Sequence, residues 1–216
     1  SGTHALAVCL FGNLRPQDEL LAITGKPYDT LEEVIGIRGE GGGSLKEFGV
    51  SYRQLDLLKD GSIDYESIKS AINEKTAMVL IQRSRGYEWR PALSIDEIEK
   101  AISIIKSVKN DIVVLVDNCY GEFVEDREPV EVGADLVAGS LIKNPGGGLA
   151  PTGGYIAGKK ECVEKAAYRL TTPGLGKHVG ASLGHNRQMF QGLFMAPHVV
   201  AESLKGAVFC AGVMEA

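Results

Sequence analysis

Residues 112–117, which read IVVLVD, decide the fold class of this chain. Five apolar residues follow one another without a polar break, and such a run is typical of a parallel strand that helices cover on both faces. Asp117 ends the run, so its carboxylate is expected to lie partly desolvated at the carboxyl edge of the sheet. Open α/β sheets bind ligands at that edge, which makes Asp117 a candidate functional residue. The alternative is a loop aspartate that caps backbone amides.

Short apolar runs alternate with amphipathic segments along the rest of the chain, as in βαβ units. The sequence therefore predicts an α/β domain of three layers, with a mostly parallel sheet between helices. Ser94 and Glu97 have the spacing of a capping box, which begins a helix. We expect further strands at Leu20–Thr24, Ser51–Leu57, Ala77–Ile81, Leu136–Ala138 and Tyr155–Ala157. We expect further helices at Tyr65–Asn73, capped by Asp64, and over residues 182–216, interrupted near Pro197.

The composition is that of an ordinary globular protein. Hydrophobic residues make up 44% and charged residues 24% of the 216 residues, enough for a sizeable core in one large domain or two small ones. A net charge of −5 argues against a broad nucleic-acid surface. Because no run of about 18 uninterrupted apolar residues occurs, we expect no membrane span.

The cysteines, histidines and chain ends give further expectations. Scattered cysteines without a CxxC pair indicate reduced thiols of a cytoplasmic protein, namely Cys9, Cys119, Cys162 and Cys210. The histidines lack metal-binding spacing, so we expect no metal site. The chain starts at Ser1 without a signal-like segment and stops at Ala216 within an apolar helical pattern. We therefore expect that residues 1–216 are one domain excised from a longer protein.

Polar residues follow four of the predicted strands, at Thr24-Gly25, at Gln82-Arg83-Ser84, at Asp117-Asn118 and at Ser140. Parallel strands bring such positions to one edge of the sheet, where they form a candidate site. The glycine-rich stretch Gly36–Gly49 lacks the GxxxxGK[ST] pattern of a phosphate-binding loop. We interpret it as a long mobile surface loop.

Two further features point to chemistry. Lys143 stands between apolar neighbours and a glycine-rich turn, and a lysine in such a place can act as a nucleophile towards carbonyls. The alternative is an exposed loop lysine. Residues 1–8 read SGTHALAV, small and hydroxyl residues that open an apolar helical stretch. The N-terminus of such a helix suits a phosphate. The alternative is that Ser1 is an ordinary helix cap.

These elements, in this order, resemble the pyridoxal-phosphate enzymes of the aspartate-aminotransferase fold. The aspartate after a buried strand and the Ser140-Leu141-Ile142-Lys143 run resemble the cysteine and methionine metabolism branch. The strings VDNCYGEFVE (116–125), GSLIKNPGGGLAPTGGYIAG (139–158) and RLTTPGLGKHVGA (169–181) are similar to one subgroup. That subgroup is the methionine gamma-lyase-related "aluminium resistance" proteins, often described as cystathionine beta-lyase-like. The resemblance covers nearly the whole chain and implies the large cofactor domain of that fold.

The resemblance implies the roles of two catalytic residues. Lys143 would form the covalent link with the aldehyde of pyridoxal 5'-phosphate. Asp117 would pair with the pyridinium nitrogen and keep it protonated, which strengthens the electron sink.

It also implies residues that hold the cofactor. Gly2 and Thr3 would offer backbone N–H groups to the phosphate, Thr3 would add its hydroxyl, and Ser140 a further contact. Tyr28 would stack on the pyridine ring, with His4 as the rival for that place. The roles of residues 82–85 stay open.

The resemblance implies a carbon–sulfur lyase that acts on a sulfur amino acid by beta- or gamma-elimination. Two alternatives from the same fold are an aminotransferase and an aldolase. Two from other classes are a nucleotide-binding domain that uses Gly2 and Thr3, and a binding module without turnover. The expected partners are a small amino-acid substrate and further copies of the chain, as a homodimer or homotetramer.

Overall fold

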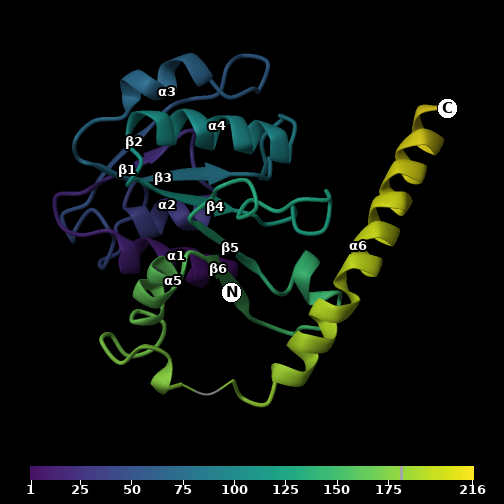
Figure 1. Cartoon of the computed structure of the whole chain (residues 1–216). Helices are drawn as coiled ribbons and strands as arrows, with labels where there is room; N and C mark the ends of the chain where they lie inside the picture. Colours follow the sequence, from purple (N-terminus) through teal and green to yellow (C-terminus); the bar gives the residue numbers. More distant parts are fainter. Residues whose placement is uncertain (181) are drawn as a thin grey trace.

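The computed structural model describes residues 1–180 and 182–216, and it contains one six-stranded sheet with helices on both faces (Figure 1). The strands are β1 (Glu19–Ala22), β2 (Ser51–Gln54), β3 (Thr76–Gln82), β4 (Val113–Asp117), β5 (Leu136–Ser140) and β6 (Gly154–Gly158). The helices are α1 (Gly2–Asn13), α2 (Asp29–Ile35), α3 (Tyr65–Ala71), α4 (Ile95–Val108), α5 (Lys160–Ala167) and α6 (Asn186–Glu215). Two 3₁₀ turns are η1 (Asn144–Gly146) and η2 (Gly176–His178).

The sheet has the strand order β2-β1-β3-β4-β5-β6. All neighbouring pairs are parallel except β5 and β6, which are antiparallel. The central strands β3 and β4 are buried along most of their length, because helices cover both of their faces. The predicted three-layer α/β fold with a mostly parallel sheet is therefore confirmed.

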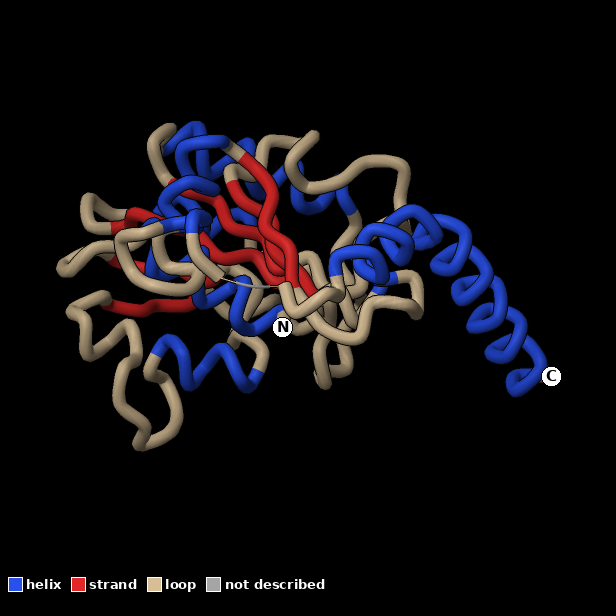
Figure 2. The backbone as a smooth tube through the Cα atoms, turned by 90° about the horizontal axis from the view of Figure 1, so that it is seen from below, coloured by secondary structure: helices blue, strands red, loops and turns tan. Residues whose placement is uncertain are grey.

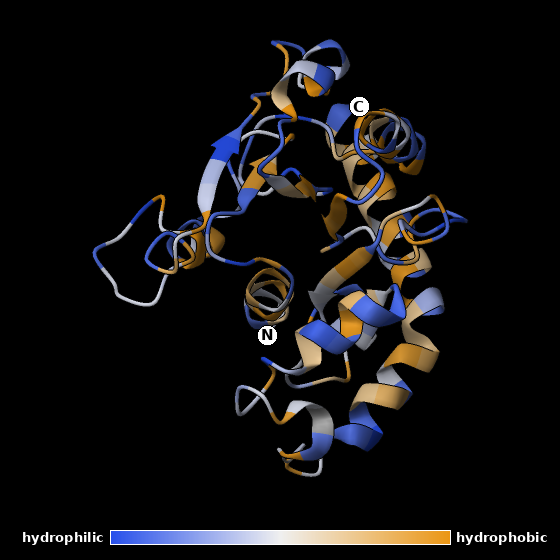
Figure 3. Cartoon of the chain, turned by 60° about the vertical axis from the view of Figure 1, so that its left-hand side comes forward, coloured by the Kyte–Doolittle hydropathy of each residue, from blue (hydrophilic) through white to orange (hydrophobic). Residues whose placement is uncertain are grey.

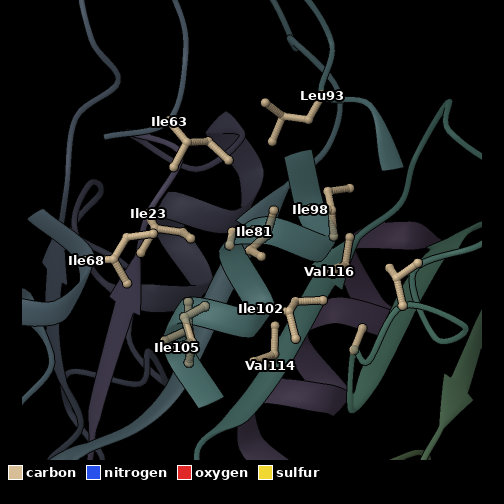
Figure 4. Packing of buried hydrophobic residues seen from close by; sticks show 14 of the residues in the cluster. Ile23, Ile63, Ile68, Ile81, Leu93, Ile98, Ile102, Ile105, Val114 and Val116 are labelled. Carbon is tan, nitrogen blue, oxygen red and sulfur yellow. The ribbon is translucent and has the colours of Figure 1, made fainter. Parts of the chain in front are cut away.

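Alternate residues of the strands face two separate cores. Val114 and Val116 of β4 point to the face covered by α3 and α4, where isoleucines pack most of the space (Figure 4). Leu115 points to the opposite face, where α1, α2 and α5 pack. On the first face Ser94 caps α4: its Oγ accepts from the amide of Glu97, whose carboxylate accepts from the Ser94 amide. The predicted capping box is thus present.

Two sequence expectations need correction. The predicted break at Pro197 does not occur, since α6 continues through this residue. A proline there removes one backbone hydrogen bond, and the carbonyl left over belongs to Leu193, an exposed residue. The stretch 36–49 is only in part a surface loop. Leu45 is 1% exposed in the core beneath α2, and its amide donates to Val34 O at 2.9 Å.

Helix α6 leaves the body of the protein and extends away from it (Figure 2). Its first half packs on η1 through Gly192 and Ala196, whereas residues 201–216 are exposed. Apolar and polar residues mix along the exposed half, which ends at the C mark in Figure 3. Among the described residues, α6 is the one helix long and apolar enough to cross a membrane by length and composition, which is weak evidence for a span. That no segment spans a membrane stays a prediction.

Candidate functional site

The polar residues at the strand ends meet at the carboxyl edge of the sheet. In the register of the parallel strands, Gln82 lies beside Asp117, and Asp117 beside Ala138, two residues before Ser140. Thr24 joins them from the end of β1, because its Oγ1 accepts from the amide of Gln82 at 2.9 Å. The expectation that four strand ends deliver polar groups to one edge agrees with this geometry.

A cleft of about 400 Å³ opens at this edge, beside the N-terminus of α1. It brings together all six residues that the sequence singles out for the cofactor, namely Gly2, Thr3, Tyr28, Asp117, Ser140 and Lys143. Further residues complete the lining: Ser1, Leu6, Thr30, Leu31, Ser84, Gly86, Tyr87, Cys119, Tyr120 and Ile142. The rival ring residue, His4, lies outside the cleft, with its Nε2 3.2 Å from Leu170 O.

The first turn of α1 forms one end of the cleft. A Cβ at Gly2 would lie 3.0 Å from the Cβ of Ser140, so glycine lets the helix start approach the end of β5. The amides of Gly2 and Thr3 belong to the first turn and have no intrahelical acceptor. Thr3 Oγ1 lies 2.9 Å from Thr30 Oγ1, which fixes a hydroxyl pair beside these amides. This end of the cleft therefore presents donors that suit a phosphate.

Asp117 forms the floor of the cleft. It is 5% exposed, and its Oδ1 accepts from the amide of Cys119 at 3.1 Å. Burial raises the pKa of Asp117, whereas the Cys119 hydrogen bonds and the charge of Lys143 act in the opposite direction. The same burial, together with the charge of Asp117, raises the pKa of Cys119 to about 12, so this thiol stays protonated. A buried carboxylate in this position is stabilised by a cation placed in the cleft.

Lys143 reaches the cleft from the turn after β5. Its amide donates to Ser140 O at 3.2 Å, and its carbonyl accepts from Gly146 N in the turn η1. Gly146 is required there, since a Cβ would collide with the carbonyl oxygen of Leu141. The Lys143 Nζ lies 4.3 Å from the ring centre of Tyr120 and 5.9 Å from that of Tyr28. The Lys143 amine therefore lies near two aromatic rings of the cleft.

Tyr28 is fixed by its neighbours in the cleft. Its amide donates to Gln82 Oε1 at 2.7 Å, and its ring stacks on Tyr87 with 5.6 Å between centroids. The two hydroxyls lie 3.1 Å apart, and this hydrogen bond raises the pKa of Tyr28 to about 12. The phenol therefore stays neutral, and its ring is available as a stacking surface.

Residues 82–85, at the end of β3 and just after it, have different contacts, and the sequence left their roles open. Gln82 positions Tyr28, and Ser84 lines the cleft. Arg83 is 2% exposed and binds the segment after β4, donating to Asn118 Oδ1 at 2.8 Å and to Glu125 at 2.6 Å. Arg85 lies on the surface, 5.5 Å above the ring of Trp89. Of these four, Arg83 is thus a structural residue of the sheet edge.

Sequence reasoning missed Tyr120 and Glu122, which lie on the segment after β4. Tyr120 has a positive φ of 68°, a conformation that costs energy for a tyrosine and that nothing in the sequence marks. Glu122 is 4% exposed and accepts from Tyr155 Oη at 2.8 Å, while its Oε2 has no hydrogen-bond partner among the described residues. Burial raises the pKa of Glu122 to about 7. Both residues lie within five positions of Asp117 and within the string VDNCYGEFVE (116–125), which are the signals that pointed towards them.

Taken together, the cleft offers phosphate donors at one end, a buried carboxylate in the floor, a flat aromatic wall and an amine. This set suits a flat, phosphorylated ring with a basic nitrogen and a carbonyl group. The string 169–181, one of the three that carry the resemblance, ends at Ala181, which lies outside the described residues.

The family model described as methionine gamma-lyase matches residues 1–216, the whole chain. YnbB of Bacillus subtilis, described as uncharacterized, is 59% identical over 216 residues, which are 100% of this chain and 51% of that protein. An L-methionine gamma-lyase of Pseudomonas deceptionensis is 27% identical over 85% of this chain and 40% of its own length. The chain thus spans about half the length of the curated relatives it matches.

A solved structure from Listeria monocytogenes superposes on the chain with a TM-score of 0.93 and 58% identity. It is described as a candidate cystathionine beta-lyase involved in aluminum resistance, and the match covers 96% of this chain and 51% of that one. Both the family model and this structure agree with the resemblance inferred from the sequence. The chain belongs to the methionine gamma-lyase family.

Proposed function

We propose that this chain is the cofactor-binding part of a pyridoxal-phosphate-dependent carbon–sulfur lyase that acts on a sulfur amino acid. The observation that carries the proposal is the single cleft in which Lys143, Asp117 and the first turn of α1 face one another. The family and the description of the Listeria structure support a lyase-like role.

The residues present fit pyridoxal 5'-phosphate. Asp117 is a buried carboxylate that gains from a protonated ring nitrogen. Gly2 is a position where a Cβ would narrow the space beside Ser140, and it leaves the amides of the helix start open to a phosphate. Tyr28 supplies the stacking ring, and Lys143 supplies the amine. When bound, the cofactor supplies an electron sink for the bonds at the substrate's α carbon.

The protein's own residues orient the substrate and move protons. Asp117 would hold the ring nitrogen of the cofactor protonated, and Tyr28 would offer its ring as a stacking surface. Lys143 would take the proton from the α carbon of the substrate. In beta-elimination, the bond from the β carbon to sulfur then breaks and the thiol leaves with a proton. One water is consumed, and ammonia and a 2-oxo acid are the other products.

The first experiment is an absorbance spectrum of the protein expressed from its complete gene, before and after borohydride. We expect a visible band that borohydride removes while fixing the cofactor on Lys143, identified by peptide mass. Lys143→Ala abolishes the band, and Lys160→Ala, at a fully exposed lysine, leaves it unchanged. A wild-type protein without a band, even after added pyridoxal phosphate, overturns the proposal in favour of a nucleotide-binding domain or a module without turnover.

Product analysis separates the lyase from an aminotransferase or aldolase. A lyase releases a thiol, ammonia and a 2-oxo acid in equal amounts from one thioether amino acid. An aminotransferase instead yields the oxo acid only when a second oxo acid accepts the amino group. Equal release of thiol and ammonia without an acceptor is the expected result.

We further propose that residues 1–216 form the large domain of a longer, cytoplasmic protein that assembles as a homodimer or homotetramer. The support is the match of the chain to about half of each related protein. Light scattering of the protein expressed from its complete gene measures the assembly, and a monomer contradicts it.

A further inference from the structure

A second hollow of about 510 Å³ adjoins the cofactor cleft. It lies between the loop after β3 and the segment after β4, with Leu93 and Val124 among its apolar walls. The two hollows share three lining residues: Ser84, Gly86 and Tyr120. A molecule that reacts near Lys143 can therefore extend past Tyr120 into this second space.

The charges of the second hollow are almost all neutralised within the protein. Arg83 is buried and binds Glu125, with 2.6 Å between Nη2 and Oε1. Glu125 also accepts from the amide of Ile95 at the start of α4, so its negative charge is satisfied twice. The charges of Arg83 and Glu125 are thus paired with each other, and the pair joins the two walls of the hollow.

Arg85 is the exception. Its guanidinium has no carboxylate within ion-pair distance among residues 1–180 and 182–216. It lies 5.5 Å above the ring of Trp89, which is 95% exposed. Stacking on an indole restricts the guanidinium to fewer orientations, so less entropy is lost when it binds an anion. One end of the hollow is therefore formed by the guanidinium of Arg85, which lacks an ion-pair partner among the described residues and is restricted by Trp89.

From this arrangement we infer that the second hollow binds the leaving part of the substrate, and that Arg85 selects leaving thiols that carry a carboxylate. The substrate class is thioether amino acids with an acidic group beyond the sulfur, in preference to simple S-alkyl amino acids. Apolar walls suit the methylene groups next to sulfur, and the guanidinium suits the carboxylate at their end. The inference rests on the lyase function proposed for the cleft, since that chemistry places the sulfur beside Tyr120.

The test uses two substrates that differ only in charge, S-(2-carboxyethyl)cysteine and S-(2-carbamoylethyl)cysteine. We expect wild-type protein to prefer the carboxylate in kcat/KM by roughly ten- to hundredfold, the effect of one charge-assisted hydrogen bond. Arg85→Gln removes this preference through the KM of the carboxylate substrate and leaves the carboxamide unchanged. Arg85→Lys retains part of the preference. Arg38→Gln, at an exposed arginine of another loop, retains all of it.

A second readout separates this inference from the proposed lyase function. Either compound, on binding, perturbs the visible band of the bound cofactor, which gives a Kd without turnover. If neither compound is cleaved but Arg85→Gln still weakens binding of the carboxylate alone, the lyase proposal fails and the subsite stands. If Arg85→Gln weakens both compounds equally, or neither, or if neither compound binds, the subsite is overturned.

Discussion

At the scale of single residues, Tyr120 combines backbone strain with a contact to the amine of Lys143. A tyrosine with φ of 68° is strained relative to glycine or asparagine, and such strain gathers at functional sites. The same residue places its ring 4.3 Å from the Lys143 Nζ. Tyr120 thus keeps a conformation that stability alone would not favour.

We expect Tyr120→Asn to make the protein more stable by about 1 kcal/mol, because asparagine adopts positive φ more readily. Urea unfolding measures the gain. Tyr168→Asn is the matched control, since Tyr168 is also an exposed tyrosine but has a φ of −67°, and it should give no gain. Equal effects of the two substitutions would show that the backbone at residue 120 is not strained.

Glu122 predicts a pH dependence of stability. Because burial raises the pKa of Glu122 to about 7, the folded state holds a proton that the unfolded state releases near pH 4.5. The free energy of unfolding therefore falls as the pH rises between about 4.5 and 7. Glu122→Gln has no charge to bury, and its Oε1 still accepts from Tyr155.

Glu122→Gln and wild type should have similar free energies of unfolding near pH 4.5. At pH 8 that of the variant should be higher by roughly 3 kcal/mol. Denaturant unfolding at several pH values measures the difference. Glu131→Gln, on the same segment, is the control and should follow wild type. A difference between Glu122→Gln and wild type that stays constant with pH would contradict the shifted pKa.

At the scale of elements, α1 and α5 pack so closely that only glycine fits between them. A Cβ at Gly12 would lie 2.7 Å from the Cα of Ala166, and Asn13 Nδ2 donates to Cys162 O nearby. α1 also presents the first-turn amides of the cleft. The position of these amides therefore depends on the contact at its other end.

Gly12→Ala should destabilise the protein by about 1–3 kcal/mol, although alanine is the better helix former. The physical reason is the clash with the backbone of α5. Gly206→Ala in α6 is the control, since nothing lies within 4 Å of its Cβ, and it should not lower stability. Thermal unfolding measures both, and a Gly12→Ala variant as stable as wild type would contradict the tight packing.

The sequence predicted elements well where local chemistry decides them. The capping box at Ser94 and the cap at Asp64 are local hydrogen bonds, and both occur. The proline at 197 was misleading because its effect depends on whether solvent reaches the freed carbonyl, which is a tertiary property. Leu45 was hidden in a glycine-rich stretch for the same kind of reason, since its burial depends on α2 lying above it.

At the scale of the whole molecule, Asp135 ties the layers together. It is buried before β5 and binds Lys106 of α4 at 2.7 Å and Lys159, just before α5, at 2.6 Å. Burial alone would raise the pKa of Asp135, but these two lysines and the amide of Val114 hold it below its usual value. This ionised carboxylate therefore joins the sheet to both helical layers.

Asp135→Asn should cost about 2–3 kcal/mol of stability at pH 7. A lowered pKa contributes stability above the unfolded value near 3.9, and that contribution is lost as the pH falls through the folded pKa. The gap between wild type and variant should thus stay constant from pH 6 to 8 and narrow as the pH falls below about 4 towards the lowered pKa of the folded state. Asp111→Asn is the control at an exposed aspartate. A gap that does not narrow as the pH falls below about 4 would contradict the linkage.

The candidate site was predictable as far as parallel strands determine it. Asp117 and Ser140 end β4 and β5, which pair as parallel neighbours, so the sheet alone brings them to one edge. Thr30 and Tyr87 come from segments whose path depends on packing, and no periodicity or motif marks them. The sequence did not distinguish Arg85 from Arg83. The structure does, because Arg83 is paired with Glu125.

The contact between α1 and α5 has a consequence for how the protein is made. Helix α1 is translated before its docking surface on β5 and α5, which follow it by about 120 to 150 residues. At 5–20 residues per second, this docking surface follows α1 after roughly six to thirty seconds. During that interval the apolar face of α1 is accessible to chaperones, and the cleft can form only after Lys143 has been translated, because both α1 and Lys143 line it.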